Sequence, residues 1–204
     1  MLHASFLLYP LLAFPSGEAA PADTVPPIPW AGYAPSRLIV HTAGGQGLVA
    51  AGLGWTTKTD KLAIDVLGGY VPKAYSITSM GVFTAKASYA PWQWQQAATR
   101  WRVQPLAFGA LVSHTVSKGL STTWDSRYRP NYYWWSARTR VGGFAGSSVG
   151  YVFHPSRRGY ARSIAAYYEL GTNDLYVATY WKNWDALPVS SLLTLGFGLR
   201  VQLW

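Results

Sequence analysis

The residues best suited to covalent chemistry lie in the last third of the chain. His154 and Ser156 are separated by one residue, and Glu169 follows on the next predicted strand. A histidine can take the proton of a serine hydroxyl while a carboxylate orients the histidine, which is the logic of a catalytic triad. Pro155 works against this hypothesis, because a proline interrupts the strand pairing that would aim His154 and Ser156 alike.

A second pair of chemically capable residues consists of Glu169 and Asp174. Two nearby carboxylates can share acid–base work. They can instead receive Arg162 and Arg200 as ion-pair partners. Nothing in the sequence marks either carboxylate as accessible to solvent, so we favour ion pairing.

Metal and cofactor signals are absent from the sequence. Its four histidines, His3, His41, His114 and His154, lie in separate segments without H-x-x-x-H spacing. It contains no cysteine, no G-x-x-x-x-G-K-S/T loop and no G-x-S-x-G elbow. We therefore expect no metal and no cofactor. The net charge of +9 is dispersed along the chain, so we do not expect a nucleic-acid partner either.

The elements that must position these residues are β-strands. Apolar residues alternate with small or polar ones most clearly at the end of the chain, where one face is wholly apolar. That face holds Leu193, Leu195, Phe197, Leu199, Val201 and Leu203. The whole alternating segment is about eleven residues long, which is the length of a tilted transmembrane strand.

The alternation recurs in enough segments to define a fold class. We place strands at 36–43, 46–57, 61–71, 77–90, 99–117, 132–153, 161–182 and 190–204. The prediction is an all-β fold: a closed antiparallel up-and-down transmembrane β-barrel of about eight strands. An even strand count brings both chain ends to the periplasmic side, with Lys58–Asp60 and His154–Gly159 in short turns there and Lys118–Asn131 in a long outer loop.

Three glycine-containing stretches qualify this assignment. Gly44, Gly45 and Gln46 form a turn or, alternatively, a bulge within one long strand. The apolar alternation changes phase near residues 171–173, where we expect a bulge, and near residues 142–146.

Composition points to a membrane barrel. Only 12% of residues are charged, against about 25% in soluble domains. No run approaches the ~20 apolar residues of a membrane helix. Aromatic clusters at predicted strand ends fit an interfacial girdle. We expect a bacterial outer-membrane location.

The N-terminal part reads as export and linker sequence. Residues 1–22 have an apolar core and an A-x-A site at Ala20–Ala22, as in a signal peptide, although no Lys or Arg precedes the core. A buried segment of the mature fold is the alternative. Residues 23–35 form a proline-rich linker, and residues 36–204 form the barrel.

If apolar faces meet lipid, the charged side chains point inward. An eight-stranded barrel is about filled by its side chains, so we predict an ion-paired lumen. Its members are Asp65, Lys86, Arg102, Arg138, Arg140, Ser163, Glu169, Asp174 and Arg200. A polar site at one rim, with excess arginine binding an anionic group, is the alternative.

Two resemblances accompany these patterns. His154-x-Ser156 with a downstream Glu169, in a barrel of this length, resembles outer-membrane lipid A deacylases, which implies those three residues as a catalytic set. Residues 69–73, 86–92, 168–176 and 195–202 resemble uncharacterised small outer-membrane barrel proteins, which implies a barrel and no activity. The terminal aromatic of such barrels normally shares the lipid-facing register, whereas Trp204 is out of phase by one residue.

These observations favour a non-enzymatic barrel that acts as a structural element, an adhesion surface or a partner subunit of an envelope complex. Expected partners are outer-membrane lipid or lipopolysaccharide and other envelope proteins. The alternatives are a lipid A ester hydrolase and a narrow anion-preferring channel or small-ligand carrier. A soluble β-sandwich or lipocalin-like binder is a further possibility.

Overall fold

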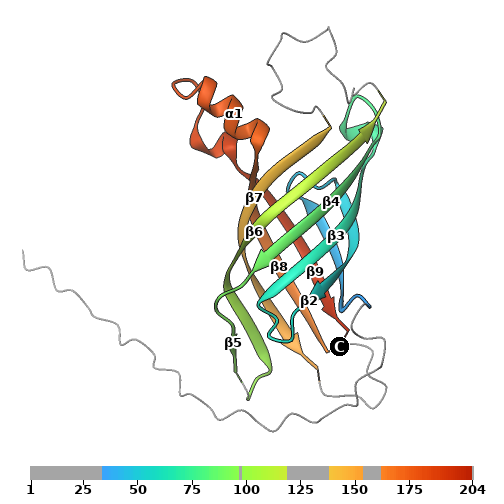
Figure 1. Cartoon of the computed structure of the whole chain (residues 1–204), viewed down its shortest axis with the longest axis vertical. Helices are drawn as coiled ribbons and strands as arrows, with labels where there is room; N and C mark the ends of the chain where they lie inside the picture. The colour runs from blue at the N-terminus through green and yellow to red at the C-terminus, as the bar shows by residue number, and fades with distance from the viewer. Residues whose placement is uncertain (1–33, 97, 119–137, 154–161, 204) are drawn as a thin grey trace, which may run out of the picture.

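The fold is an eight-stranded antiparallel barrel, seen in a computed structural model that describes residues 34–96, 98–118, 138–153 and 162–203 (Figure 1). Its eight strands are Arg37–Ala43 (β1), Val49–Thr56 (β2), Leu62–Val71 (β3), Met80–Tyr89 (β4), Trp101–Ser117 (β6), Thr139–Val152 (β7), Ser163–Asn173 (β8) and Thr194–Gln202 (β9). A two-residue strand, Trp94–Gln95 (β5), pairs with the start of β6. Short 3₁₀ helices lie at Lys73–Tyr75 (η1) and Val189–Leu192 (η2).

Each of the eight barrel strands pairs with the next barrel strand along the chain, and the pairing of the last with the first closes the sheet. β4 pairs with β6 across the excursion that contains β5, and β1 pairs with β9 along Arg37–Ala43. All of these pairings are antiparallel. The predicted all-β, up-and-down barrel of about eight strands is therefore confirmed.

The alternation of residue types explains why these segments form one closed sheet. In β4, Val82, Thr84 and Lys86 are buried in the interior, whereas Phe83 and the two alanines that follow at alternate positions are exposed on the outer face. The other strands alternate in the same way. Closure leaves no unpaired sheet edge, so the backbone groups of the wall are satisfied within the barrel.

The predicted strand over 161–182 is wrong in its second half. β8 runs in continuous register to Asn173, with no bulge at residues 171–173, and the chain then forms the helix Asp174–Lys182 (α1). Asn173 caps this helix by accepting a hydrogen bond from the Tyr176 backbone N–H at 3.0 Å. The apparent change of phase was the start of a helix, because an Asn cap followed by an acidic first turn favours helix initiation.

The predicted phase change at residues 142–146 is also wrong. β7 keeps one alternation through this stretch, with Phe144 and Ser148 on the inner face. The register shift lies on the neighbouring strand, between Gln104 and Ala107 of β6. The Ser147 hydroxyl donates to the Gln104 carbonyl at 2.9 Å, so this irregular part of β6 keeps a hydrogen-bond partner.

The turns lie at the predicted positions where they are described. Residues 44–47 form a turn between β1 and β2, with Gly44, Gly45 and Gly47 at positive φ. Residues 57–61 form the turn between β2 and β3, in which Asp60 has φ 52°. The predicted turn at His154–Gly159 lies outside the described residues, as does all but the first residue of the predicted loop Lys118–Asn131.

The longest described excursion leaves the barrel between β8 and β9. Figure 1 shows α1 to one side of the barrel, at the end opposite the C-terminus. None of its side chains is fully buried. Across the described residues, no helix is both long and apolar enough to cross a membrane.

Candidate functional site

Charged side chains occur once on nearly every barrel strand and face the interior. They alternate with outward apolar residues, so the strand pleat itself sends them inward. They are Arg37 (β1), Asp65 (β3), Lys86 (β4), Arg102 (β6), Arg140 (β7), Glu169 (β8) and Arg200 (β9).

A shared carboxylate joins two cations at the centre of the lumen. The Lys86 ammonium donates to Glu169 Oε2, and Arg200 Nη2 donates to Glu169 Oε1 at 3.1 Å. The Lys86 side chain is only 1% exposed. Aromatic rings complete its surroundings, because Lys86 Nζ lies 4.6 Å from the ring centre of Phe144 and the Arg200 guanidinium lies 3.9 Å from that of Tyr167. Ring faces stabilise cations, so both charges gain contacts beyond the carboxylate.

A second ion pair joins two strands that are not neighbours. Arg37 of β1 donates through Nε and Nη2 to Asp65 Oδ1 of β3, with the Nε contact at 2.8 Å. Gly54 of β2 lies between them in register. A Cβ at this position would lie 2.7 Å from Arg37 Nε and would also collide with the Asp65 carboxylate. The glycine therefore opens the path across β2.

A buried His–Tyr pair lies next to the central cluster, because Tyr167 contacts both Arg200 and His41. His41 Nδ1 lies 2.9 Å from the Tyr167 hydroxyl, and the two rings are stacked with centres 5.7 Å apart. Gly196 provides the space for the imidazole, because a Cβ there would lie 2.6 Å from His41 Nε2. His41 Nε2 itself is buried and has no hydrogen-bond partner among the described residues.

Each end of the lumen carries an ion pair of its own. At the end near the termini, Arg102 Nη1 donates to Asp60 Oδ2 at 2.9 Å, and its other nitrogens donate to Gln95. At the opposite end, Arg140 Nη1 donates to Asp174 Oδ2 at 3.4 Å, which links β7 to the first turn of α1.

The remaining predicted residues fall into different places. Arg138 directly precedes β7, where its carbonyl accepts from the Thr115 N–H at 2.8 Å. Ser163 begins β8 on the inner face. Glu169 and Asp174 bind different cations. Arg162, which was proposed as a partner for them, is exposed and directly precedes β8. These two carboxylates are therefore parts of separate ion pairs.

Of the predicted hydrolase set, the structure describes only Glu169. His154 and Ser156 lie outside the described residues. Both carboxylate oxygens of Glu169 accept hydrogen bonds from Lys86 and Arg200. No group of three or more potential metal-ligating side chains exists in the described part of the chain.

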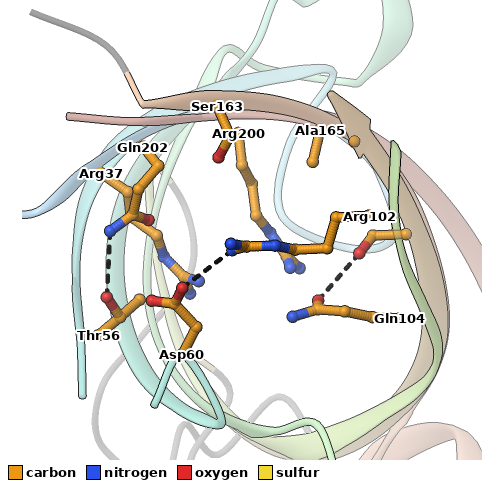
Figure 2. Close-up of a pocket in the computed structure, with 11 residues that line it drawn as sticks. Arg37, Thr56, Asp60, Arg102, Gln104, Ser163, Ala165, Arg200 and Gln202 are labelled. Carbon is orange, nitrogen blue, oxygen red and sulfur yellow. Dashed lines mark hydrogen bonds and ion pairs between the residues drawn. The ribbon is translucent and has the colours of Figure 1, made fainter. Parts of the chain in front are cut away.

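A polar hollow lies inside the barrel, lined by residues near the start of β1 and the end of β9 (Figure 2). Its volume is about 60 Å³. The lining consists of three arginines, one carboxylate, small residues and neutral hydrogen-bonding side chains: Arg37, Thr56, Asp60, Arg102, Gln104, Ser148, Gly150, Ser163, Ala165, Arg200 and Gln202. Arg102 reaches across this hollow to Asp60.

Beyond the hollow, toward the middle of the barrel, side chains fill the lumen. Leu67, His41, Thr84 and Asp65 are fully buried, so side chains rather than open space occupy the middle of the barrel. The fold and its interior thus define a small closed β-barrel with an ion-paired lumen. The chain has no match to a family model, a curated protein or a solved structure.

Sequence reasoning missed several members of this interior. Arg37, His41 and Tyr167 were not among the predicted lumenal residues, although each lies in phase with inward positions of its strand. Asp60 was placed in a turn without a role. The available signal for the first three was strand parity. For Asp60 there was none, because a turn residue has no fixed inward phase.

Proposed function

We propose that this protein is a small bacterial outer-membrane β-barrel with a filled polar lumen, acting without catalysis as a structural element, an adhesion surface or a partner subunit in the envelope. The observation that carries the proposal is the partition of charge. In the described strands, every Asp, Glu, Lys and Arg side chain faces the interior, and the outer face is predominantly apolar.

The apolar face surrounds the barrel. It includes Leu38, Val40, Leu53, Ile64, Val66, Phe83, Phe108, Val112, Val141, Val149, Ile164, Leu170, Leu195, Phe197 and Leu199, all substantially exposed. A soluble protein rarely exposes a continuous apolar patch larger than a few hundred Å². In a hydrocarbon layer such a surface is not exposed to water, so it carries no unfavourable hydration free energy.

Aromatic side chains on the outer surface fit membrane interfaces. Near the end with the termini, Trp101 packs edge-on against Tyr151 with ring centres 5.6 Å apart, and Tyr89 contacts Phe108 at 5.8 Å. Interfacial belts of Trp and Tyr flank the apolar band of membrane barrels. These positions support an aromatic girdle at that end.

The segment between β8 and β9, at the opposite end of the barrel, also carries exposed aromatic side chains. Val177 and Trp181 are four residues apart and share one side of α1, and Trp184 follows just after the helix. Trp181 and Trp184 are 81% and 68% exposed. Thr179 lies on the opposite side of the helix. We place this aromatic side in the lipid headgroup region, where an amphipathic helix buries its apolar face.

Spin labelling tests the membrane placement. The chain has no cysteine, so single substitutions V149C, F197C, W181C, T179C and K58C each carry one nitroxide in protein refolded into lipid vesicles. We expect oxygen to relax the labels at 149, 197 and 181 more than a water-soluble nickel complex does. Label 58, in a turn, should show the reverse. Equal access of the nickel complex at all positions would refute the proposal.

The α1 placement has a matched control in the same experiment. Labels at 181 and 179 lie on opposite sides of one helix, so lipid contact at 181 alone supports the interfacial position. Shielding of label 181 from both relaxing agents would instead indicate a protein partner on this side.

The filled lumen favours a closed barrel over a channel. Ion pairs and fully buried side chains occupy its middle, so no water-filled path is expected there. Planar-bilayer recordings should show no conductance steps above the lipid background. Stable anion-selective steps would favour the channel alternative.

Mass spectrometry of lipid A distinguishes the non-enzymatic proposal from the deacylase alternative. Lipid A from cells with and without the protein should carry the same acyl chains. A lost acyl chain that returns in an S156A variant would overturn the proposal.

A further inference from the structure

The charges between the centre of the lumen and the barrel end where β1 begins do not balance. Four cations, Arg37, Lys86, Arg102 and Arg200, lie there with three carboxylates, Asp60, Asp65 and Glu169. The pairs Arg37–Asp65 and Arg102–Asp60 are one to one. The excess arises because Lys86 and Arg200 share Glu169. Among the described residues, one positive charge therefore remains without a counterpart in a region where uncompensated charge is costly.

The hollow lies on the arginine side of this cluster. Arg37 and Arg200 line it, whereas Lys86 and Glu169 do not. Arg37 is only 6% exposed, so its charge is poorly hydrated. The hydrogen bonds of Arg37 to Asp65 use two of the five N–H donors of a guanidinium. Donors thus converge on a space that a compensating group can occupy.

The size and lining of the hollow define what fits. About 60 Å³ exceeds the ~10–15 Å³ needed for one water, which suits a few waters or one small tetrahedral ion. Thr56, Ser148, Ser163 and Gln202 add neutral hydrogen-bonding groups to the wall. Planar guanidinium groups match the oxygen geometry of phosphate.

We propose that this hollow is a binding site for a phosphate monoester or inorganic phosphate, held by Arg37 and Arg200 from within and by Arg102 at the mouth. Asp60 occupies the mouth as a competing carboxylate. In Figure 2 Arg102 extends over the hollow toward Asp60. Binding of the anion exchanges the Asp60 contact of Arg102 for a contact with the ligand.

The mouth pair suits such an exchange. The Arg102 and Asp60 side chains are 27% and 31% exposed, so separating them leaves neither charge in a dry interior. The backbone holds Asp60 in place, because the Gln93 side-chain amide donates to the Asp60 carbonyl at 2.7 Å. Only side chains need to move.

Isothermal titration of the refolded full chain in detergent tests this site. Inorganic phosphate and glycerol phosphate are titrated separately at constant ionic strength. We expect R102Q to weaken binding by about tenfold or more, since a charge-assisted contact is lost. We expect D60N to tighten binding, because it removes the competing carboxylate. Asn tolerates the positive φ of residue 60, so this variant keeps the turn.

The matched control is R140Q, which removes an arginine from the ion pair at the opposite end. It should bind like the unmodified protein. Binding of both ligands supports a general phosphate site, and binding of glycerol phosphate alone supports a lipid headgroup as its source. Absence of binding in the unmodified chain, or equal affinity in R102Q, D60N and R140Q, would overturn the inference. The site does not depend on the membrane placement, which the spin labels test separately.

Discussion

Replacing the shared carboxylate should destabilise the barrel more than replacing either cation bound to it. E169Q leaves Lys86 and Arg200 facing each other without a negative charge between them. Removing one partner of a buried ion pair costs about 3–5 kcal/mol. We expect E169Q to fall in this range, because Gln retains hydrogen-bonding capacity but supplies no charge.

K86M provides the matched comparison. It leaves Glu169 and Arg200 as a one-to-one pair and places an apolar side chain of similar length near Phe144. The loss is then one hydrogen bond to a charged group, about 1.5–3 kcal/mol. R102Q, at the partly exposed mouth pair, should cost no more than ~1 kcal/mol.

Reversible denaturant unfolding from lipid vesicles, followed by tryptophan emission, measures these free energies. The expected order of destabilisation is E169Q, then K86M, then R102Q. A K86M variant that loses as much stability as E169Q, or more, would refute the reasoning that one carboxylate neutralises two cations.

Two further predictions concern packing and the outer face. G196A should lose about 1–3 kcal/mol of stability by overpacking, because its methyl group would lie 2.6 Å from His41 Nε2; G68A, whose methyl group meets no atom within 4 Å, is the control, and equal unfolding free energies in the two variants would contradict the assigned contact. F197R should cost about 2–4 kcal/mol of vesicle-insertion free energy if this outer position lies near the middle of the bilayer, whereas Y70R, near the end of β3, should cost about 0–1 kcal/mol; equal partitioning of the two variants between buffer and vesicles would argue against a membrane around the barrel.

Strand alternation made the barrel predictable from sequence. Period-two patterns located all eight barrel strands, because each strand separates an apolar outer face from a different inner face. The pattern at the end of the chain carried the clearest information: its alternation matches the outward Leu195, Phe197 and Leu199 of β9.

The errors arose where a different local signal competed with alternation. Asn173 and Asp174 begin a helix, and Lys182 lies in its last turn; these are recognisable cap and dipole signals. The bulge region on β6 contains Pro105, which cannot donate a ladder hydrogen bond. Glycines alone suggested an irregularity on β7 that does not exist.

The partners within the lumen could not be predicted from periodicity. Asp65 lies directly opposite Lys86 in the β3–β4 register, yet it binds Arg37 two strands away. Lys86 instead reaches Glu169 of β8 across the interior. Alternation shows that a side chain points inward, but the contacts it makes there depend on closure, strand tilt and gaps such as Gly54.

The pairing of β1 with β9 has a kinetic consequence. Arg37 pairs with Gln202, so the seam that completes the cylinder joins nearly the first and the last described residues. Bringing such distant segments together is entropically slow. Until β9 has been synthesised, β1 retains an open edge that can capture other strands. The nascent chain therefore needs protection from aggregation until its final strand is available.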